Sequence, residues 1–494
     1  MEGNRLTITQ QSFTKPKTII MNYFVKKTWL VLFSCMFFML ACHKEMSTKS
    51  IKTQDEDVAV KSDEAHGHLK QTKTYSSDVV KKWLALQVPL LYSPPTPYGV
   101  NPGRFMAYCG VAVYESVVPG MPAYQSLYGQ LNQMPEMPKT EPGKAYHWPT
   151  CVNAALAEMT RKLFTFTPAT NAAVQQLENE LNSKYEAEIG DAATFERSKM
   201  FGKAVAEKIF NWSTSDRPWT SWPAYTLTHH EQGYWWPENN NPVIPNGIAY
   251  WGQTRTMVQG SIDDVISQPY DYSENASSPY YKDYKEVYDI SRSLTAAQKR
   301  QAKYYDDPAV NGWPAGSSYI SVFKQIIEQL NPSLDITAVA YAKTGMSLMD
   351  ATIGSFKGKF TYLKERPFQF IRRVIEPSND PATWWKPFIP TPPYPDFPAN
   401  HATFSGAFAY ALTSIFGENV HFTNSTYAGH MVTIDGSSVD LGSYSYDSFY
   451  EYAHAIAISR VYGGIHTRRA VEEGTFQGMK TAENIDRKIK FLKQ

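Results

Sequence analysis

The sequence is short of cysteine and has no excess of either charge. Only 4 of its 494 residues are cysteine, and 48 Lys and Arg residues balance 47 Asp and Glu residues to a formal net charge of +1. A general nucleic-acid-binding protein carries a basic excess, so this balance argues against nucleic acid as a partner. The sequence has no CxxC pair, G-x-S-x-G elbow, Walker phosphate loop or HExxH helix. It therefore gives no sign of a structural zinc site or of those catalytic sites.

Long hydrophobic runs are also missing, except for one near the N-terminus. Residues 28–41 carry no charge and are almost wholly apolar, and Lys26 and Lys27 precede them. The run is shorter than the about 20 residues that a transmembrane helix needs. Its length and basic flank are typical of a secretory signal. We therefore predict a signal peptide over residues 1–42, with Met21 as the start of a conventional signal.

The signal ends in Met39-Leu40-Ala41-Cys42, which resembles the lipobox of bacterial lipoproteins. In such proteins the cysteine is lipidated and becomes the first residue, so Cys42 is the expected lipidation site. The alternative is an uncleaved anchor. Residues 43–75 are rich in Lys, Ser, Thr, Asp and Glu and predict a flexible tether. The expected location is the bacterial cell envelope, lipid-anchored to a membrane and facing the periplasm or the cell surface.

The rest of the chain is dominated by helical patterns and predicts an all-α, bundle-like fold. We expect an N-terminal helical part over residues 76–330 and a C-terminal helical part over residues 331–494. An irregular excursion rich in Trp, Pro, Asn and His interrupts the first part at residues 215–279. Cys109 and Cys151 would form one disulfide or remain two buried thiols. The clearest helices of the first part are expected at Arg104–Val117, Val152–Leu163, Pro168–Tyr185 and Ala192–Trp212.

The second part has three clear helical faces. Apolar residues recur at spacings of three and four over Val339–Phe360, His401–Ile415 and Phe449–Arg460. Gly417 stands where the second of these helices would end, as a C-cap. Seven prolines between residues 381 and 398 exclude both a helix and a central strand there.

Three short segments of this second part carry the chemistry. They are Lys359-x6-Arg366-Pro367, Pro398-Ala399-Asn400-His401 and Ser459-Arg460-x5-His466. Taken singly, each has an ordinary structural explanation. A Lys–Arg pair usually forms a solvated face, a histidine at a helix start is usually a cap or a core residue, and an arginine on an apolar stripe usually pairs with a carboxylate.

Taken together, the segments would bring three cations and two histidines to one place. Burying Lys359, Arg366 and Arg460 without an anionic partner is prohibitively unfavourable, and a tetrahedral oxyanion with two or three negative charges is such a partner. Arginine offers a planar fork for its oxygens, and the helix N-terminus near His401 adds free N–H groups. His401 and His466 would supply an acid/base and a nucleophile or ligand.

In order, residue type and spacing, these segments resemble the motifs of the superfamily of type 2 phosphatidic acid phosphatases and vanadium-dependent haloperoxidases. Those motifs read K-x(6)-R-P, P-S-G-H and S-R-x(5)-H-x(3)-D. Three neighbouring stretches, Asp350-Ala351, Pro392–Pro395 and Tyr462–Gly464, look like the bacterial haloperoxidase branch. The resemblance implies a helical bundle of the vanadium haloperoxidase and acid phosphatase type.

The resemblance also implies a role for each motif residue. His466 would be the ligand of vanadate in a haloperoxidase, or the nucleophile that forms phosphohistidine in a phosphatase. Lys359, Arg366 and Arg460 would hold the equatorial oxygens of the anion. His401 would be the acid/base.

The chain departs from the superfamily motifs at three positions. Ala399 and Asn400 replace the Ser and Gly of the second motif, so the backbone N–H or the side-chain amide of Asn400 would have to donate to the anion. Ala470 replaces the Asp that orients the nucleophilic His in phosphatases. A phosphatase would then need Glu473 or a carboxylate distant in sequence. Vanadate coordination depends less on that Asp, so the change favours a haloperoxidase.

Three functions remain open from the sequence. The first is a vanadate-dependent enzyme that oxidises halide with hydrogen peroxide. The second uses the same pocket, without a cofactor, to hydrolyse phosphate monoesters or lipid and diphosphate substrates. The third is a glycan-binding surface lipoprotein, which the expected lipid anchor and the many Trp and Tyr residues would suit. The three-motif constellation speaks against this third function because a binding module does not need it.

Overall fold

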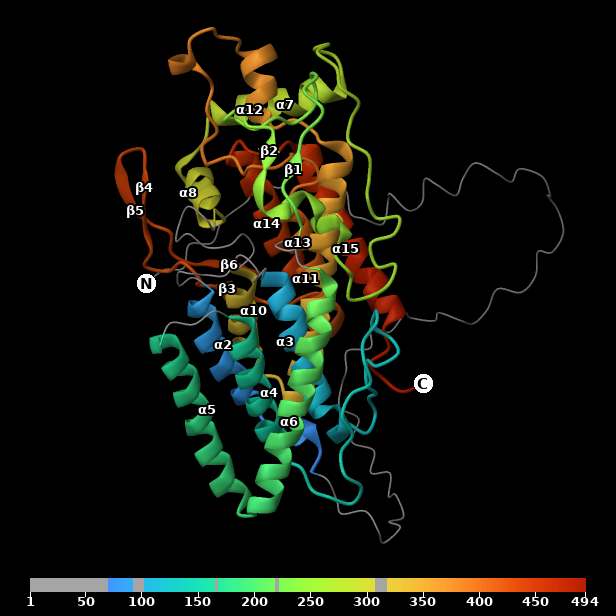
Figure 1. Ribbon diagram of the computed structural model, residues 1–494. Helices are drawn as coiled ribbons and strands as arrows, with labels where there is room; N and C mark the ends of the chain where they lie inside the picture. Colours follow the sequence, from blue (N-terminus) through green and yellow to red (C-terminus); the bar gives the residue numbers. More distant parts are fainter. Residues whose placement is uncertain (1–69, 92–101, 165–167, 218–221, 307–317) are drawn as a thin grey trace, which may run out of the picture. The chain divides into compact units, whose positions relative to one another are not determined.

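The computed structural model describes residues 70–91, 102–164, 168–217, 222–306 and 318–494 (Figure 1). The expected signal peptide, Cys42 and most of the expected tether lie outside these residues. The last tether residues lie inside them and are packed against the body. Thr72 is buried and donates to the carbonyl of Val117 at 2.9 Å, and Trp148 Nε1 donates to the carbonyl of Lys70 at 2.7 Å.

The described residues are mainly helical, as the sequence predicts. The α-helices are α2 (Asp78–Leu90), α3 (Pro102–Val117), α4 (Trp148–Leu163), α5 (Pro168–Ile189), α6 (Ala192–Ser213), α7 (Pro279–Ser291), α8 (Ala296–Tyr304), α10 (Ser318–Leu330), α11 (Leu334–Tyr362), α12 (Pro367–Phe370), α13 (Asn400–Phe416), α14 (Phe449–Tyr462) and α15 (Arg468–Lys488). The strands are β1 (Tyr225–Thr226), β2 (Val243–Ile244), β3 (Phe422–Asn424), β4 (Met431–Ile434), β5 (Ser437–Asp440) and β6 (Tyr444–Tyr446). The all-α fold class is confirmed, and each helix expected from periodicity is present with its ends shifted by a few residues.

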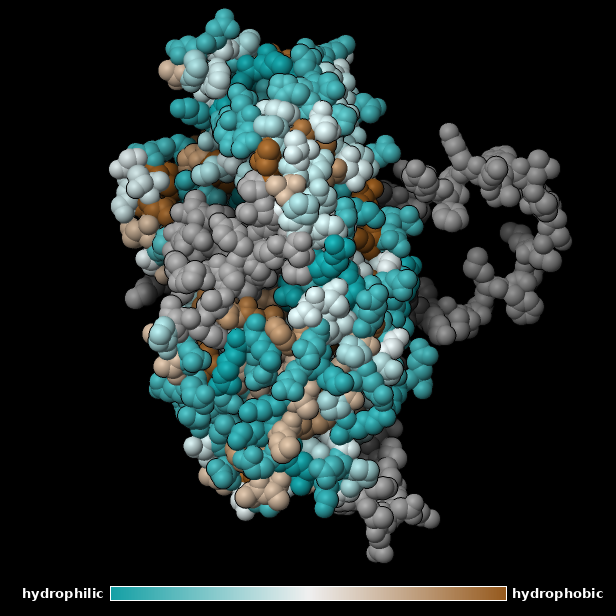
Figure 2. Space-filling model, in the orientation of Figure 1, coloured by the Kyte–Doolittle hydropathy of each residue, from teal (hydrophilic) through white to brown (hydrophobic). Residues whose placement is uncertain are grey.

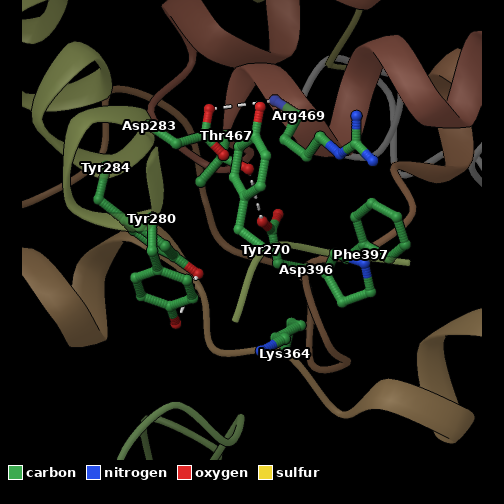
Figure 3. Close-up of a pocket in the computed structure, with 10 residues that line it drawn as sticks. Tyr270, Tyr280, Asp283, Tyr284, Lys364, Asp396, Phe397, Thr467 and Arg469 are labelled. Atoms are coloured by element: carbon green, nitrogen blue, oxygen red, sulfur yellow. Dashed lines mark hydrogen bonds between the residues drawn. The ribbon is translucent and has the colours of Figure 1, made fainter. Parts of the chain in front are cut away.

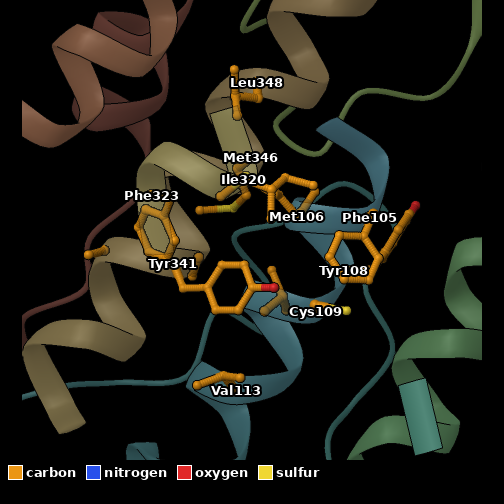
Figure 4. Close-up of a cluster of buried hydrophobic side chains, with 14 of the residues drawn as sticks. Phe105, Met106, Tyr108, Cys109, Val113, Ile320, Phe323, Tyr341, Met346 and Leu348 are labelled. Carbon is orange, nitrogen blue, oxygen red and sulfur yellow. The ribbon is translucent and has the colours of Figure 1, made fainter. Parts of the chain in front are cut away.

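The centre of the fold is the close pair of helices α3 and α11 (Figure 1). Two glycines permit their backbones to touch. A Cβ on Gly110 would lie 2.5 Å from the carbonyl oxygen of Tyr341, and a Cβ on Gly345 would lie 2.3 Å from that of Met106. Figure 4 shows the apolar side chains that α3, α10 and α11 gather around this contact. Because α3 belongs to the expected N-terminal part and α11 to the C-terminal part, both parts share one hydrophobic core.

A second close pair, α13 and α15, positions two of the three motifs. Gly478 on α15 faces α13 so closely that a Cβ there would lie 1.9 Å from the carbonyl oxygen of Thr403. The start of α13 is held by a hydrogen bond of 2.9 Å from the N–H of Ala399 to the carbonyl of Ala470 in α15. Helix α11 also contacts both α13 and α15. The end of α11 and the beginnings of α13 and α15 therefore meet at one place.

Short strands form three two-stranded antiparallel sheets, β1–β2, β3–β6 and β4–β5. The sequence gives little sign of them, because strands of two to four residues are too short to show alternation. The β4–β5 hairpin turns through Asp435 and Gly436, which both have positive φ, as a two-residue hairpin turn requires. In the expected excursion at residues 215–279 lie β1, β2 and the 3-10 helix Pro245–Gln253. The proline-rich stretch has one short 3-10 turn, Pro381–Thr383, and otherwise neither helix nor strand.

Cys109 and Cys151 are buried free thiols, so the disulfide alternative is wrong. Within the described ranges, no helix combines the length and the apolar composition that a membrane crossing requires. The face of the molecule in Figure 2 is mainly hydrophilic, with apolar side chains scattered over it.

Candidate active site

Lys359 joins the end of α11 to the proline-rich segment that precedes α13. It lies in the last turn of the helix and is fully buried. Its Nζ donates to the carbonyls of Pro395, Asp396 and Pro398 at 2.8, 3.0 and 2.6 Å. Burial, with the neighbouring charge of Arg366, holds the pKa of Lys359 well below its usual range. The three carbonyls fix the ammonium group and the loop in one arrangement.

Arg366 stands at the N-cap of α12 and is also fully buried. Its Nε donates to the carbonyl of Tyr394 at 2.8 Å, and its Nη1 donates to the carbonyl of Ile465 at 2.7 Å. Nη1 also lies 3.1 Å from Nε2 of His466. Its Nη2 is buried and has no hydrogen-bond partner among the described residues. The guanidinium thus has an unused donor beside the imidazole.

Arg460 comes from the last turn of α14 and is 2% exposed. Its Nη1 donates to the carbonyl of Tyr305 at 2.5 Å. Its Nε is buried and, in the part of the chain that the structure describes, has no hydrogen-bond partner. The charge of Arg460 acts on both Arg366 and His466. Arg460 of the third motif therefore lies close to Arg366 of the first motif.

His466 lies in the turn between α14 and α15, and it is 2% exposed. Its Nδ1 lies 2.5 Å from Oδ1 of Asp396. Burial and the charges of Arg366, Lys359, Arg460 and His401 hold the pKa of His466 well below its usual range. The imidazole is therefore neutral at physiological pH.

Asp396 is the residue that sequence reasoning missed. It is 1% exposed and lies in the proline-rich segment, 70 residues before His466. Burial raises the pKa of Asp396 to about 7, although the charges of Arg366 and Lys359 act in the opposite direction. Glu473, the nearby alternative for the carboxylate that Ala470 lacks, pairs with Arg469 instead. Of the two replacements considered for the motif aspartate, Glu473 and a carboxylate distant in sequence, the structure therefore supports the second, which is Asp396.

His401 and Asn400 begin α13, and both are buried. The carbonyl of His401 accepts a hydrogen bond of 2.9 Å from the hydroxyl of Tyr319, and its charge is close enough to act on His466. Oδ1 of Asn400 accepts a hydrogen bond of 2.6 Å from the hydroxyl of Ser355, one helical turn before Lys359. This bond occupies the side-chain oxygen of Asn400, so its NH₂ group is the part of the amide that could donate to an anion. Ala399, the N-cap residue, makes no side-chain capping bond.

The structure thus brings together all six residues that the motifs predict, namely Lys359, Arg366, Asn400, His401, Arg460 and His466. The guanidinium groups of Arg366 and Arg460 and the amine of Lys359 are buried beside one buried carboxylate, so the pocket has more basic groups than acidic ones. The unpartnered Nη2 of Arg366 and Nε of Arg460 are donors for oxygens. These groups fit a tetrahedral oxyanion such as vanadate or phosphate.

Comparison with known proteins shows which proteins this chain is similar to. Residues 339–493 match the family model of the VCPO second helical-bundle domain. A bacterial vanadium-dependent iodoperoxidase superposes with a TM-score of 0.73 at 26% sequence identity, covering 85% of this chain and 98% of that one. The chain is thus similar to bacterial vanadium haloperoxidases in its fold, and its C-terminal part matches their second helical bundle. No curated protein sequence matches it.

Two further structures share the fold of this chain. The apo form of a bacterial vanadium-dependent chloroperoxidase superposes with a TM-score of 0.56 at 15% identity, covering 78% of this chain and 93% of that one. A holo form gives 0.56 at 16% identity, covering 86% and 96%. These structural neighbours are haloperoxidases, which are oxidoreductases.

Proposed function

We propose that the protein is a vanadium-dependent haloperoxidase that oxidises halide with hydrogen peroxide. The observation that carries the proposal is the gathering of Lys359, Arg366 and Arg460 around the buried His466, whose Nε2 lies 3.1 Å from Nη1 of Arg366. When bound, vanadate supplies a Lewis-acidic centre that activates peroxide without a change of its own oxidation state. Overall, hydrogen peroxide, a halide ion and one proton give hypohalous acid and water.

In this reaction the protein residues bind, orient and move a proton. Lys359, Arg366 and Arg460 would hold the oxygens of the anion, and Nε2 of His466 would be its ligand. The buried position of these side chains excludes bulk water, which strengthens their electrostatic attraction for the anion. His401, at the start of α13, would hold and transfer the proton that the reaction consumes.

A second function, phosphate ester hydrolysis, is favoured by the contact of Asp396 with His466. In this reaction Nε2 of His466 would attack phosphorus, the bond from phosphorus to the ester oxygen would break, and His401 would protonate the leaving alcohol. Water would then attack the phosphohistidine and release phosphate and the imidazole. A carboxylate on Nδ1 stabilises the positive imidazole that forms in the first step.

The two functions are separated by assaying one preparation in both ways. After loading with orthovanadate, the protein should oxidise bromide or iodide with peroxide, measured by dye halogenation. Without vanadate it should release nitrophenol from nitrophenyl phosphate at a much lower rate. His466→Ala should silence both activities, whereas His421→Ala, an exposed histidine paired with Asp447, should leave both intact. Fast ester hydrolysis with no halogenation at any halide would overturn the haloperoxidase proposal in favour of the phosphatase.

We further propose that the protein is a lipoprotein of the bacterial cell envelope, because an apolar run with a basic flank ends in Met39-Leu40-Ala41-Cys42. Cys42→Ala should move the protein from the membrane fraction to the soluble fraction, since the lipid would be its membrane contact. Fractionation and fatty-acid labelling measure this. A wild-type protein that incorporates no fatty acid and retains residues before Cys42 would contradict the prediction.

A further inference from the structure

We propose that Asp396 is the positioning residue of His466, in place of the aspartate that the superfamily motif carries at the position of Ala470. Its role is to keep the proton of the imidazole on Nδ1, so that Nε2 presents its lone pair to the anion. The proposal deepens the proposed function, because it names what sets the affinity of that pocket for a tetrahedral oxyanion.

The carboxylate of Asp396 is held on both of its oxygens. Oδ1 accepts from Nδ1 of His466 at 2.5 Å, and Oδ2 accepts from the hydroxyl of Thr467 at 3.2 Å. Its backbone is fixed as well, since its N–H donates to the carbonyl of Lys364 at 3.0 Å and its carbonyl accepts from Lys359. A carboxylate fixed at this number of points can orient a ring, whereas a mobile one cannot.

The position of the imidazole proton follows from the partners of the two ring nitrogens. Arg366 Nη1, which lies 3.1 Å from Nε2, can only donate, so Nε2 is the acceptor. A carboxylate can only accept when it is ionised, so Nδ1 is the donor to Asp396. The hydrogen-bond network therefore assigns the proton to Nδ1 and the lone pair to Nε2, on the side of the cations.

The surroundings of Asp396 are polar on the side away from His466. Figure 3 shows a small pocket in which Thr467 lies between Asp283 and Asp396, with Lys364 and Arg469 also in its lining. Asp283 accepts from the N–H of Arg469 at 3.1 Å. Asp396 therefore lines this pocket and also contacts the imidazole of His466.

Ala470 is fully buried in the first turn of α15, and its N–H donates to the hydroxyl of Thr467 at 3.3 Å. The position that carries the aspartate in the superfamily motif therefore adjoins the residue that holds Asp396. Position 470, at the beginning of α15, has alanine where the motif has aspartate. The carboxylate of Asp396 contacts His466 from the proline-rich segment instead. This relation makes a direct exchange test possible.

The test is nitrogen NMR of protein with ¹⁵N-labelled histidine, with no vanadate present. In the wild type, His466 should show a protonated Nδ1 and an unprotonated Nε2. Asp396→Ala should remove this preference and weaken orthovanadate binding, measured by calorimetry, by about 10- to 100-fold. Asp396→Ala with Ala470→Asp should restore both signals. If Asp396→Ala does not fold, Asp396→Asn should keep the proton on Nδ1 through its amide oxygen and weaken orthovanadate binding by less than about 10-fold relative to the wild type.

The matched control is Asp350→Asn, a buried carboxylate that contacts no histidine. Asp350 accepts from the N–H groups of Met257 and Val258 and from the hydroxyl of Ser261. The control should lower stability without moving the His466 signals. Unchanged ring-nitrogen signals and unchanged orthovanadate affinity in Asp396→Ala would overturn the proposal. Failure of the wild type to bind orthovanadate would instead overturn the proposed function, because the NMR signals do not depend on it.

Discussion

Arg366→Ala should lower the free energy of unfolding by about 3–5 kcal/mol, whereas Arg460→Ala should lower it much less. Both variants should lose the stabilisation that orthovanadate gives the wild type. A ligand that binds only the folded state at 100 times its dissociation constant adds about 2.7 kcal/mol. Arg366 would then contribute more than Arg460 to the stability of the free protein, whereas both arginines would be needed to bind orthovanadate.

The difference arises from what each guanidinium holds in the free protein. Arg366 donates to the carbonyls of Tyr394 and Ile465 and lies 4.0 Å from the carboxylate of Asp396. Removing it leaves two buried carbonyls without a donor and takes a counter-charge from a buried carboxylate. Within the described part of the chain, Arg460 donates one such bond, to the carbonyl of Tyr305. Its removal also relieves repulsion with Arg366, which partly offsets the lost bond.

The measurement is a melting curve and a urea titration of each variant, with and without orthovanadate. Arg104→Ala is the matched control, because Arg104 is another buried arginine and pairs with buried Asp216 at 2.8 Å outside the site. It should be destabilised about as much as Arg366→Ala and should keep the full response to orthovanadate. A normal vanadate response in Arg366→Ala or Arg460→Ala would remove the basis for the anion pocket.

The sequence predicts the helices and the motif residues of the site well, and for a physical reason. Helices α11, α13 and α14 place their apolar residues in the core, and these residues repeat at spacings of three and four. Helix α3 is buried on every side, so its sequence is apolar throughout most of its length. The motif residues stand at helix ends, so that Lys359 at the end of α11 and His401 at the start of α13 could be placed before the structure was known.

The contacts across the fold could not be predicted in the same way. Asp396 reaches His466 over 70 residues, and Arg460 reaches the carbonyl of Tyr305 over 155 residues. Neither separation has a period that a sequence would show. An aspartate among prolines also has an ordinary explanation as a turn residue. Its burial, at 1% exposure, and its contact with Nδ1 of His466 mark Asp396 as part of the site.

Ala470→Asp should destabilise the protein by about 3 kcal/mol or more and should not raise its phosphatase rate. From the sequence alone the opposite is expected, because the substitution would supply a missing carboxylate. The structure shows that Asp396 already contacts Nδ1 of His466. A carboxylate at the fully buried position 470 could not bond to Nδ1–H of His466, because Asp396 already accepts that hydrogen bond. It would also place a second negative charge beside Asp396.

The measurement compares the unfolding free energies and nitrophenyl phosphate rates of Ala470→Asp and Ala470→Asn. The asparagine has the same shape without the charge, so the difference between the two variants isolates the effect of the second carboxylate. We expect Ala470→Asn to be clearly the more stable. In the background of Asp396→Ala the order should reverse, because the new carboxylate is then the only partner of Nδ1. Wild-type stability together with faster ester hydrolysis in Ala470→Asp would mean that Asp396 does not serve His466.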